Sequence, residues 1–512
     1  MANEGLIELR EMRLSKIQDI KALGLNPYPS TSTRTHNIST IQDNFEIYQD
    51  KEATLAGRLM SLRKHGGMTF CTIMDQSGYI QLVLQKKRLA SLNVEDNRLG
   101  YTELSYLDIG DIVEGTGVIS KTQKGERSLF VDNLRLLSKS IRPLPDKHAG
   151  IKDREIIVRK RYLEVILDKE VKLRYMQIAK MISAARNYLE NMGFIEIATP
   201  IIQPNYGGGT AKPFKTKINA LQSTMYLAIS HELYLKRLIV AGYEKVYTIG
   251  RYFRNEGIDR SHHPEFSMIE TMTAYENYEY NMDLIEGLFK YIATKAFGTT
   301  NFLVRGNTID LSKPWKRISM VDAVKENTSL DFSRCQTLEE ANEYLGKVEI
   351  DQKCSSIGEA LVVAFEECVE KNLINPTFVC DHPIEISPLA KPKNDDPRYA
   401  ERFEIFIGGM ECGDNWSEQN DPVRLLNTWR QYYDPENSES GEFHTLDFDF
   451  IEAIEYGMPP TTGIGPGIER LAMILTGSEQ IDDVIFFPMR RQRITSANAE
   501  IFGIDGEDEE NQ

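Results

Sequence analysis

The sequence predicts an α+β protein with a small β-barrel in its N-terminal part and a larger domain of mixed helices and strands after it. Two observations lead to this fold class. Residues 53–138 contain short runs of alternating or continuous apolar residues, separated by turns rich in glycine and serine. From residue 168 onward, helical stretches alternate with strand-like segments. A chain of 512 residues is also long enough for two or three domains.

The composition fits a globular protein, since hydrophobic residues make up 41% of the chain and charged residues 27%. A net charge of −16 argues against indiscriminate nucleic-acid binding, although a local basic surface can still hold phosphates. The six cysteines form no CxxC pair, which is typical of reduced intracellular thiols. No apolar run is long enough to span a membrane and no signal peptide is visible, so we expect a cytoplasmic protein without a membrane partner.

Patterning along the chain predicts five segments. They are an N-terminal helical extension (1–50), an OB-type barrel (51–140), a proline-containing linker (141–167), a mixed α/β domain (168–490) and an acidic C-terminal tail (491–512). The barrel is expected because five short strands, with a longer connection in their middle, are typical of the OB-fold, which often binds nucleic acid. These strands are expected at 53–63, 68–75, 79–84, 111–120 and 128–137. Helices are expected at 5–24, 172–192, 281–295 and 357–372.

Two motifs carry residue types that suit a nucleotide. In the segment RYFRNEG (251–257), Arg254 and Glu256 would share one face of a strand, so that a guanidinium can bind a phosphate while a carboxylate accepts from an amine. The segment HHPEF (262–266) adds a histidine and the flat ring of Phe266. Near the other end, GIGPGIER (463–470) presents Arg470 after a glycine-rich turn that permits close approach. Together they predict an ATP site built without a P-loop.

These motifs resemble motifs 2 and 3 of the class II aminoacyl-tRNA synthetases. An amphipathic stretch, 174–189, running into GFIEIATP (193–200) resembles motif 1, so three motifs occur in the right order. The barrel and the segments IRPLPDK (141–147) and RKRYL (159–163) are similar to those of the lysyl-tRNA synthetases of subclass IIb. The resemblance covers the chain from the barrel to about residue 488.

The resemblance implies a fold, an assembly and a reaction. The fold is an OB-fold barrel followed by an antiparallel sheet flanked by helices, and the assembly is a homodimer joined through motif 1. In the reaction, L-lysine and ATP give lysyl-adenylate and pyrophosphate, and the lysyl group then moves to the 3′ end of tRNA(Lys). Adenylate formation needs no side-chain nucleophile, because the protein positions both partners and offsets the developing charge.

The resemblance also implies which residues bind ATP. They are Arg254, Glu256, His262, Phe266, Glu404, Glu411 and Arg470, with Arg254 and Arg470 as the catalytic pair. Arg254 would hold the α-phosphate and the amino-acid carboxylate, while Glu256 accepts from the adenine amino group and Phe266 stacks on the ring. His262 and Arg470 would hold the γ-phosphate.

Glu404 and Glu411 are expected to hold Mg²⁺ against the triphosphate, since oxygen ligands suit this hard ion. The alternative reading is a pair of strand carboxylates that face different directions. Their place just before the next motif favours the metal.

A further set of residues is expected to bind the amino acid: Gly208, Glu232, Arg254, Glu270, Met272, Asp414, Asn415 and Glu418. Glu232 and Glu418 match two glutamates that contact the lysine ammonium, and two converging carboxylates call for a cationic side chain. Glu270 matches the carboxylate that binds the α-amino group. Two positions depart from the family, because Met272 stands where a tyrosine is usual and Asp414 where an asparagine is usual.

Four residues on or beside the barrel strands are expected to read the anticodon: Arg63, Phe70, Gln81 and Glu126. A phenylalanine on a strand is more often a core residue than a base platform. The resemblance favours the platform, because family members stack the central anticodon base on a phenylalanine and read its edge with polar side chains at the matching positions.

Three alternatives remain at this stage. An aspartyl- or asparaginyl-tRNA synthetase shares barrel, motifs and metal, but its pocket would place Lys or Arg where Glu232 and Glu418 stand. A lysyltransferase that modifies a protein shares the fold, but relatives of that kind lack the barrel. A non-enzymatic barrel protein that binds the anticodon would not need the ATP-binding residues intact.

Overall fold

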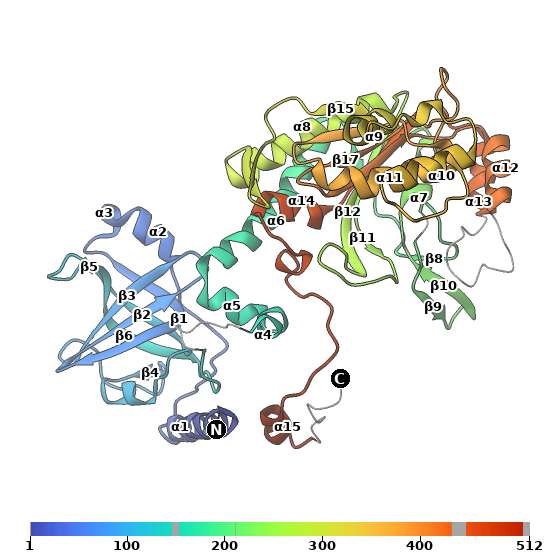
Figure 1. Ribbon diagram of the computed structural model, residues 1–512. Helices are drawn as coiled ribbons and strands as arrows, with labels where there is room; N and C mark the ends of the chain where they lie inside the picture. The colour runs from blue at the N-terminus through green and yellow to red at the C-terminus, as the bar shows by residue number, and fades with distance from the viewer. Residues whose placement is uncertain (1, 146–152, 210, 433–446, 505–512) are drawn as a thin grey trace. The chain divides into compact units, whose positions relative to one another are not determined.

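The computed structural model describes residues 2–145, 153–209, 211–432 and 447–504 (Figure 1). The chain forms two compact units, one made of residues 1–152 together with 491–512 and the other of residues 153–490. The predicted α+β class is confirmed, with a barrel in the first unit and a large sheet with helices in the second.

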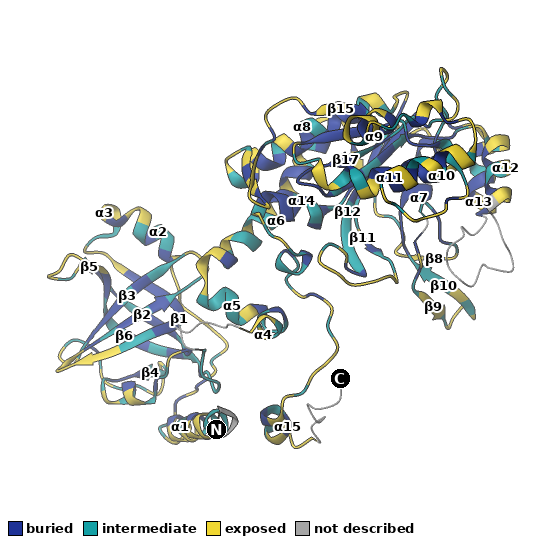
Figure 2. Cartoon of the chain, viewed as in Figure 1, coloured by how far each residue is buried: buried dark blue, intermediate teal, exposed yellow. Residues whose placement is uncertain are grey.

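All five predicted barrel strands are present in the first unit. They are β1 (Glu52–His65), β2 (Met68–Met74), β3 (Tyr79–Gln85), β5 (Ile112–Lys121) and β6 (Arg127–Ser138), and the short β4 (Arg98–Leu99) adds to β6. They follow the order β3-β2-β1-β5-β6, and pairing of β3 with β6 closes the barrel. Inward-facing residues such as Leu55, Leu82 and Leu129 are fully buried. Figure 2 shows dark blue, buried segments along the barrel strands.

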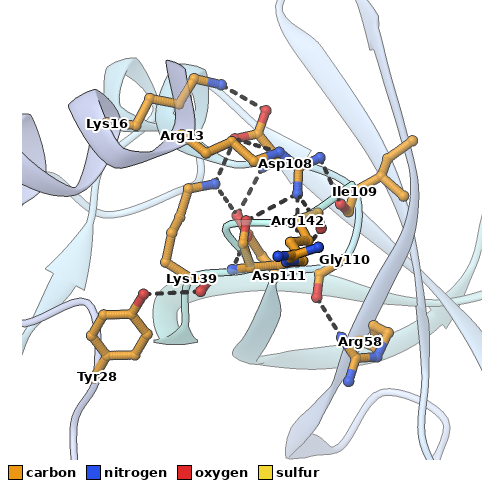
Figure 3. A network of polar contacts seen from close by, with 11 residues as sticks. Arg13, Lys16, Tyr28, Arg58, Asp108, Ile109, Gly110, Asp111, Lys139 and Arg142 are labelled. Atoms are coloured by element: carbon orange, nitrogen blue, oxygen red, sulfur yellow. Dashed lines mark hydrogen bonds and ion pairs between the residues drawn. The ribbon is translucent and has the colours of Figure 1, made fainter. Parts of the chain in front are cut away.

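A buried ionic network joins the N-terminal helix α1 (Ala2–Ala22) to the barrel (Figure 3). Lys139 has no exposed side-chain surface and pairs with Asp108 at 2.6 Å and Asp111 at 2.8 Å. From α1, Lys16 also pairs with Asp108 at 2.6 Å, and Arg13 donates to the Ser140 carbonyl at 2.9 Å. Because a buried charge is costly unless paired, these contacts fix α1 against the barrel.

The C-terminal segment belongs to the same unit. Helix α15 (Ser496–Phe502) packs against α1, and Arg142 donates to Asn498 at 2.9 Å. The segment predicted as an acidic tail therefore begins with a helix, while its acidic residues 505–512 lie outside the described residues.

The second unit is built on a sheet that has eight strands within the described residues. In spatial order they are β15 (Lys316–Ser319), β16 (Thr377–Cys380), β17 (Arg402–Phe406), β18 (Glu411–Ser417), β19 (Thr461–Pro466), β12 (Glu265–Ala274), β11 (Lys245–Phe253) and β7 (Ile195–Glu196). The neighbours from β16 to β11 are antiparallel, as predicted. The pairs at the two edges, β15 with β16 and β7 with β11, are parallel, so the whole sheet is mixed.

The three helices predicted in this unit are present as α6 (Lys169–Asn191), α8 (Tyr278–Phe297) and α11 (Ile357–Cys368). Side chains cap all three at their N-termini, since Asp168 accepts from backbone amides of α6, Asn277 from those of α8 and Ser356 from the Glu359 amide of α11. Helices α6 and α8 bury apolar faces against the sheet, with Leu189 and Phe289 fully buried beside Ile405.

Further elements complete the two units. The helices are α2 (Ile38–Asp43), α3 (Phe45–Tyr48), α4 (Arg154–Arg159), α5 (Arg161–Leu167), α7 (Glu232–Val240), α9 (Met320–Thr328), α10 (Leu338–Lys347), α12 (Pro422–Tyr432), α13 (Phe448–Glu455) and α14 (Ile468–Thr476). The strands are β8 (Ile202–Gln203), β9 (Lys215–Ile218), β10 (Ser223–Leu227), β13 (Asn301–Val304) and β14 (Asn307–Asp310). Helices α4 and α5 occupy the second half of the segment predicted as a linker. Within the described residues, no helix is both long and apolar enough to cross a membrane.

Candidate active site

The residues expected to bind ATP surround one cavity of about 360 Å³ in the second unit. Its lining includes all seven of them, namely Arg254, Glu256, His262, Phe266, Glu404, Glu411 and Arg470. They come from the β11–β12 connection, the paired strands β17 and β18, and the helix α14 that follows β19. Sheet topology therefore gathers residues that lie more than 200 positions apart.

Strand β11 ends at Phe253, one residue before Arg254, so Arg254 and Glu256 do not share a strand face as predicted. Backbone pairing nevertheless continues for one residue, because the Arg254 amide donates to the Pro264 carbonyl at 2.9 Å. The loop brings both side chains to the cavity. The Arg254 guanidinium lies 5.2 Å from the centre of the Phe266 ring, close enough for a cation–π contact.

Arg470 connects two parts of the cavity wall. Its Nη1 donates to the Glu411 carboxylate at 2.6 Å, and its Nη2 lies 3.1 Å from His262 Nε2. Burial by itself raises the pKa of Glu411, but the charge and hydrogen bond of Arg470, together with the charges of Arg254 and Arg402, outweigh this and hold the pKa below its usual value. Glu411 is therefore ionised, and the cluster presents both a carboxylate and cationic or hydrogen-bonding groups to a phosphate chain.

Arg402, which the sequence analysis missed, balances the two other carboxylates here. It contacts Asp414 through two hydrogen bonds of 3.0 and 2.7 Å and Glu404 through one of 2.8 Å. Burial raises the pKa of Glu404 and of Asp414 in spite of this cation. The sequence does contain a feature that could have predicted this role for Arg402. It lies two residues before Glu404 on β17, and this spacing puts both side chains on one face of the sheet.

A β-bulge explains why Glu411 and Asp414 both reach the cavity although an odd number of positions, three, lies from one to the other along β18. The pairing of β17 with β18 shifts between Ile405, opposite Gly413, and Phe406, opposite Glu411. The extra residue on β18 reverses the alternation of side chains at that point. Glu404 and Glu411, for which different directions were the alternative reading, both line this cavity.

The donor set of Glu404 and Glu411 suits a magnesium ion. Each uses one carboxylate oxygen for an arginine, Glu404 for Arg402 and Glu411 for Arg470, so a second oxygen remains on each to bind a cation. Among the described residues, no group of three or more His, Cys, Asp or Glu side chains is arranged to hold a metal. Two carboxylates completed by phosphates and water are the usual coordination of Mg²⁺ in nucleotide sites.

A second cavity, of about 200 Å³, adjoins the first, since Arg254, Asp414 and Gly465 line both. Its lining includes seven of the eight residues expected to bind the amino acid: Gly208, Glu232, Arg254, Glu270, Met272, Asp414 and Glu418. Asn415 is the exception. It is fully buried, donates to Thr462 at 3.2 Å and does not line the cavity, because its neighbours Asp414 and Trp416 occupy the opposite face of β18.

Glu232 and Glu418 converge at one side of this cavity, as predicted, but a lysine of the chain lies between them. Lys236, one helical turn after Glu232, contacts its carboxylate and pairs with Glu418 Oε2 at 2.5 Å. Burial and Glu232 raise the pKa of Glu418, while Lys236 opposes this rise. The spacing of Glu232 and Lys236, i and i+4 on a helix, was the signal available in the sequence.

Glu270 lies at a different place in the same cavity. Its carboxylate accepts from the Ser230 hydroxyl at 2.8 Å and from the His231 amide at 2.9 Å. Burial raises the pKa of Glu270 to about 7. Gly208 lies against the same segment, where a Cβ would stand 2.7 Å from Ser230 Oγ, so the glycine loop can approach only without a side chain.

Met272 and Gly463 form part of the wall near Glu418. They pair across β12 and β19, and a Cβ on Gly463 would lie 2.5 Å from Met272 Cε and 2.7 Å from Glu418 Oε1. Met272 thus places an apolar thioether at the position where the resembled family has a hydroxyl. The neighbouring Trp416 supplies a polar group instead, because its indole Nε1 donates to Glu418 Oε2 at 2.6 Å.

In the first unit, the four residues expected to read the anticodon gather on one outer face of the barrel. Cross-strand pairing sets Arg63 opposite Phe70 and Phe70 opposite Val83, two residues from Gln81. The side chain of Gln81 accepts a hydrogen bond from the Ser128 hydroxyl at 3.0 Å. Glu126, which is exposed, lies two residues before Ser128 in the chain. Phe70 is partly exposed and not part of the barrel core, whereas the adjacent Cys71 is.

Comparison with known proteins finds a matching family for each of the two units. The family model of class II tRNA synthetases for D, K and N matches residues 153–491, and an OB-fold nucleic-acid-binding domain matches residues 53–137. The lysine–tRNA ligase of Thermoanaerobacter pseudethanolicus is 43% identical over 492 residues, covering 96% of this chain and 97% of that protein. The lysine–tRNA ligase of Clostridium tetani is 46% identical over 486 residues, covering 94% and 95% respectively. The chain therefore belongs to the lysine–tRNA ligase family of class II aminoacyl-tRNA synthetases.

Proposed function

We propose that the protein activates L-lysine with ATP and transfers the lysyl group to the 3′ end of tRNA(Lys) in the cytoplasm. The observation that carries this proposal is the pair of joined cavities, one lined by arginines and an aromatic ring and the other by buried carboxylates. They meet at Arg254 and Asp414. A lysine carboxylate at this junction would lie beside the α-phosphate of ATP, which is the geometry that adenylate formation needs.

In the larger cavity, Arg254 holds the α-phosphate and the lysine carboxylate, and Phe266 stacks on adenine while Glu256 accepts from its amino group. His262 and Arg470, already 3.1 Å apart, hold the γ-phosphate. Such fixed cations stabilise charge that develops on the phosphates in the transition state.

Glu404 and Glu411 hold Mg²⁺ in this proposal, and the ion neutralises charge on the triphosphate when it is bound. The support is the donor set, two oxygen-bearing side chains that line the cavity beside Arg470. These carboxylates orient the phosphate chain for attack on the α-phosphate.

The smaller cavity selects lysine by charge. Glu270 binds the α-ammonium, and Glu232 with Glu418 binds the side-chain ammonium. Gly208, Met272 and Asp414 form the surrounding wall. Asn415, which faces away from the cavity, is left out of this contact set. Barrel residues Arg63, Phe70, Gln81 and Glu126 bind the anticodon, with Phe70 as the stacking platform.

The alternatives are not favoured. An aspartyl or asparaginyl substrate would bring a carboxylate or amide against the buried Glu232 and Glu418, which repel an anion. A protein-modifying lysyltransferase does not need the OB-fold domain matched at residues 53–137. A barrel protein without catalysis does not need the seven residues that line the ATP cavity.

We also propose a homodimer joined through the segment around α6 and β7. This segment carries several exposed large apolar residues, and exposed apolar surface can mark an interaction site. They are Leu173, Met176, Met192, Ile195, Ile201 and Ile202, each 37 to 49% exposed.

Replacing Arg254 with alanine should lower lysine-dependent pyrophosphate exchange by about 10²- to 10³-fold, because a fixed cation at the α-phosphate is lost. The measurement is ATP–pyrophosphate exchange at saturating lysine. Arg317→Ala, which removes an exposed arginine paired with Asp283, is the matched control and should keep full activity. Full activity of the Arg254 variant would remove this residue from the site.

The Michaelis constant for lysine should depend on pH through Glu270. Below pH 7 the free enzyme holds this carboxyl protonated, because burial raises its pKa to about 7, and the α-ammonium needs the carboxylate. The KM should therefore rise about tenfold for each pH unit below 7 and level off above it. Glu270→Gln should have a high KM without this acid limb. A KM that stays constant between pH 5.5 and 8 in the native enzyme would contradict the assignment.

Phe70→Ala should weaken tRNA binding by about 1–3 kcal/mol, since one base loses its stacking platform. Aminoacylation at limiting tRNA should fall, while pyrophosphate exchange, which needs no tRNA, should stay unchanged. Ile47→Ala, which truncates a 60% exposed side chain elsewhere in the unit, serves as the control. A parallel fall of both reactions would argue against an anticodon role.

Sedimentation should show a particle of about twice the chain mass of 58.5 kDa. Ile195→Glu should shift it towards the monomer, because a charge cannot be buried in the apolar interface without a partner. Leu303→Glu, at a 65% exposed site outside the segment, should remain dimeric. A native protein that sediments as a monomer at micromolar concentration would exclude the proposed dimer.

A further inference from the structure

The carboxylate end of the smaller cavity contains a fully buried cation of the chain itself. Lys236 is 1% exposed and lies between Glu232 and Glu418, with its Nζ 5.9 Å from the centre of the Phe450 ring. Two carboxylates held this close in a buried site cannot both stay ionised without a cation, so one would bind a proton. Lys236 pairs with both carboxylates and opposes this protonation, and with both carboxylates ionised the three side chains carry a net charge of −1.

Glu418 is held in one orientation by contacts to only one of its oxygens. Oε2 accepts from Lys236 at 2.5 Å and from the Trp416 indole at 2.6 Å. Oε1 is buried and has no hydrogen-bond partner among the described residues. A buried carboxylate oxygen without a donor is costly, which indicates that a ligand completes it.

The surroundings of Oε1 direct it towards the amino-acid cavity. Glu418 lines this cavity, and the oxygen lies 2.7 Å from the point where Gly463 would carry a Cβ. Met272, whose Cε lies 2.5 Å from the same point, offers a thioether and no donor. The remaining donor must therefore come from the molecule that fills the cavity.

We propose that Lys236 and Trp416 are positioning residues for lysine selection: they hold Glu418 by Oε2 so that Oε1 accepts a hydrogen bond from the side-chain ammonium of the substrate. This inference rests on the proposed lysine ligase function. The substrate cation then neutralises the remaining charge of −1, while a neutral side chain of the same shape leaves Oε1 without a donor. A site built to pair with a polar group rejects an analogue that lacks it far more strongly than a purely apolar pocket can.

The test compares lysine with norleucine, which has the same four side-chain carbons and a hydrogen in place of the ammonium. In the full-length Lys236→Met variant, Glu232 and Glu418 share a proton, so the net charge stays at −1. Lysine must displace this proton to bind, whereas norleucine need not. The KM for lysine should rise about 10- to 100-fold, and the ratio of kcat/KM for lysine over norleucine should fall at least about tenfold. A merely structural defect would lower kcat/KM for both substrates alike.

The pH profile gives a second readout. The groups facing Lys236 are Glu232 on its own helix, Glu418 after β18 and the Phe450 ring on α13, with Glu270 and Arg254 on the same cavity. Without Lys236, the proton shared by the two carboxylates must leave before lysine binds. The KM of the variant should therefore keep falling to a higher pH than the KM of the native enzyme, because Lys236 no longer opposes protonation of the two carboxylates.

Two further variants keep the test decisive. Trp416→Phe keeps the ring packing and removes only the indole donor, so the KM for lysine should rise about tenfold with kcat and the ATP KM unchanged. Lys393→Met removes a lysine paired with Asp381 at 2.8 Å in the same unit, away from both cavities, and should leave all constants unchanged. Binding of ATP, measured by calorimetry, reports whether each variant is folded.

The outcomes separate the two proposals. If the native enzyme shows no lysine-dependent exchange, the proposed function is wrong. If the native enzyme is active and both Lys236→Met and Trp416→Phe keep the native KM and the native lysine-to-norleucine ratio, the positioning role is overturned. If Lys236→Met does not bind ATP, Trp416→Phe alone decides, and an unchanged lysine KM in that variant also overturns it.

Discussion

The central constraint on this structure is the pairing of buried carboxylates with fixed cations. Three carboxylates around the ATP cavity are paired with arginines, Glu411 with Arg470 and both Glu404 and Asp414 with Arg402. Since a buried charge without a partner costs several kcal/mol, such groups persist only where the fold supplies a counter-ion or a ligand does. The same rule applies in the barrel, where Lys139 balances Asp108 and Asp111.

The sheet makes this pairing possible because it places chemically different side chains at fixed spacings. Arg402 and Glu404 share a face of β17, and the bulge in β18 turns Glu411 and Asp414 towards the same cavity. On the next strand, Gly463 leaves the space that lets Met272 and Glu418 approach each other. A regular strand without the bulge or the glycine could not present these groups together.

Asp414 and Met272 depart from the family pattern. The structure shows which residue pairs with the added charge of Asp414 and which residue supplies a hydrogen-bond donor near Met272. Asp414 adds a negative charge, but Arg402 binds it through two hydrogen bonds, so the added charge is paired. Met272 removes a hydroxyl from the cavity wall. The indole of Trp416 provides a donor to Glu418 from the neighbouring β18. The cavity thus keeps its preference for a cation with a different set of polar contacts.

The sequence by itself determined the barrel strands and the three main helices, because alternation and helical periodicity are local signals. The residues that line the larger cavity were expected from the resemblance of their motifs to a known family, and the structure brings them together. Only the tertiary structure decided that Lys236 lies between Glu232 and Glu418, that Arg402 pairs with Asp414 and that Asn415 faces away from the cavity. It also decided that the strand before Arg254 ends one residue early and that the C-terminal segment forms a helix against α1. These features depend on strand register, a bulge and contacts between residues distant in sequence. None of them alters the local spacing of apolar and polar residues, so they could not be predicted from that spacing.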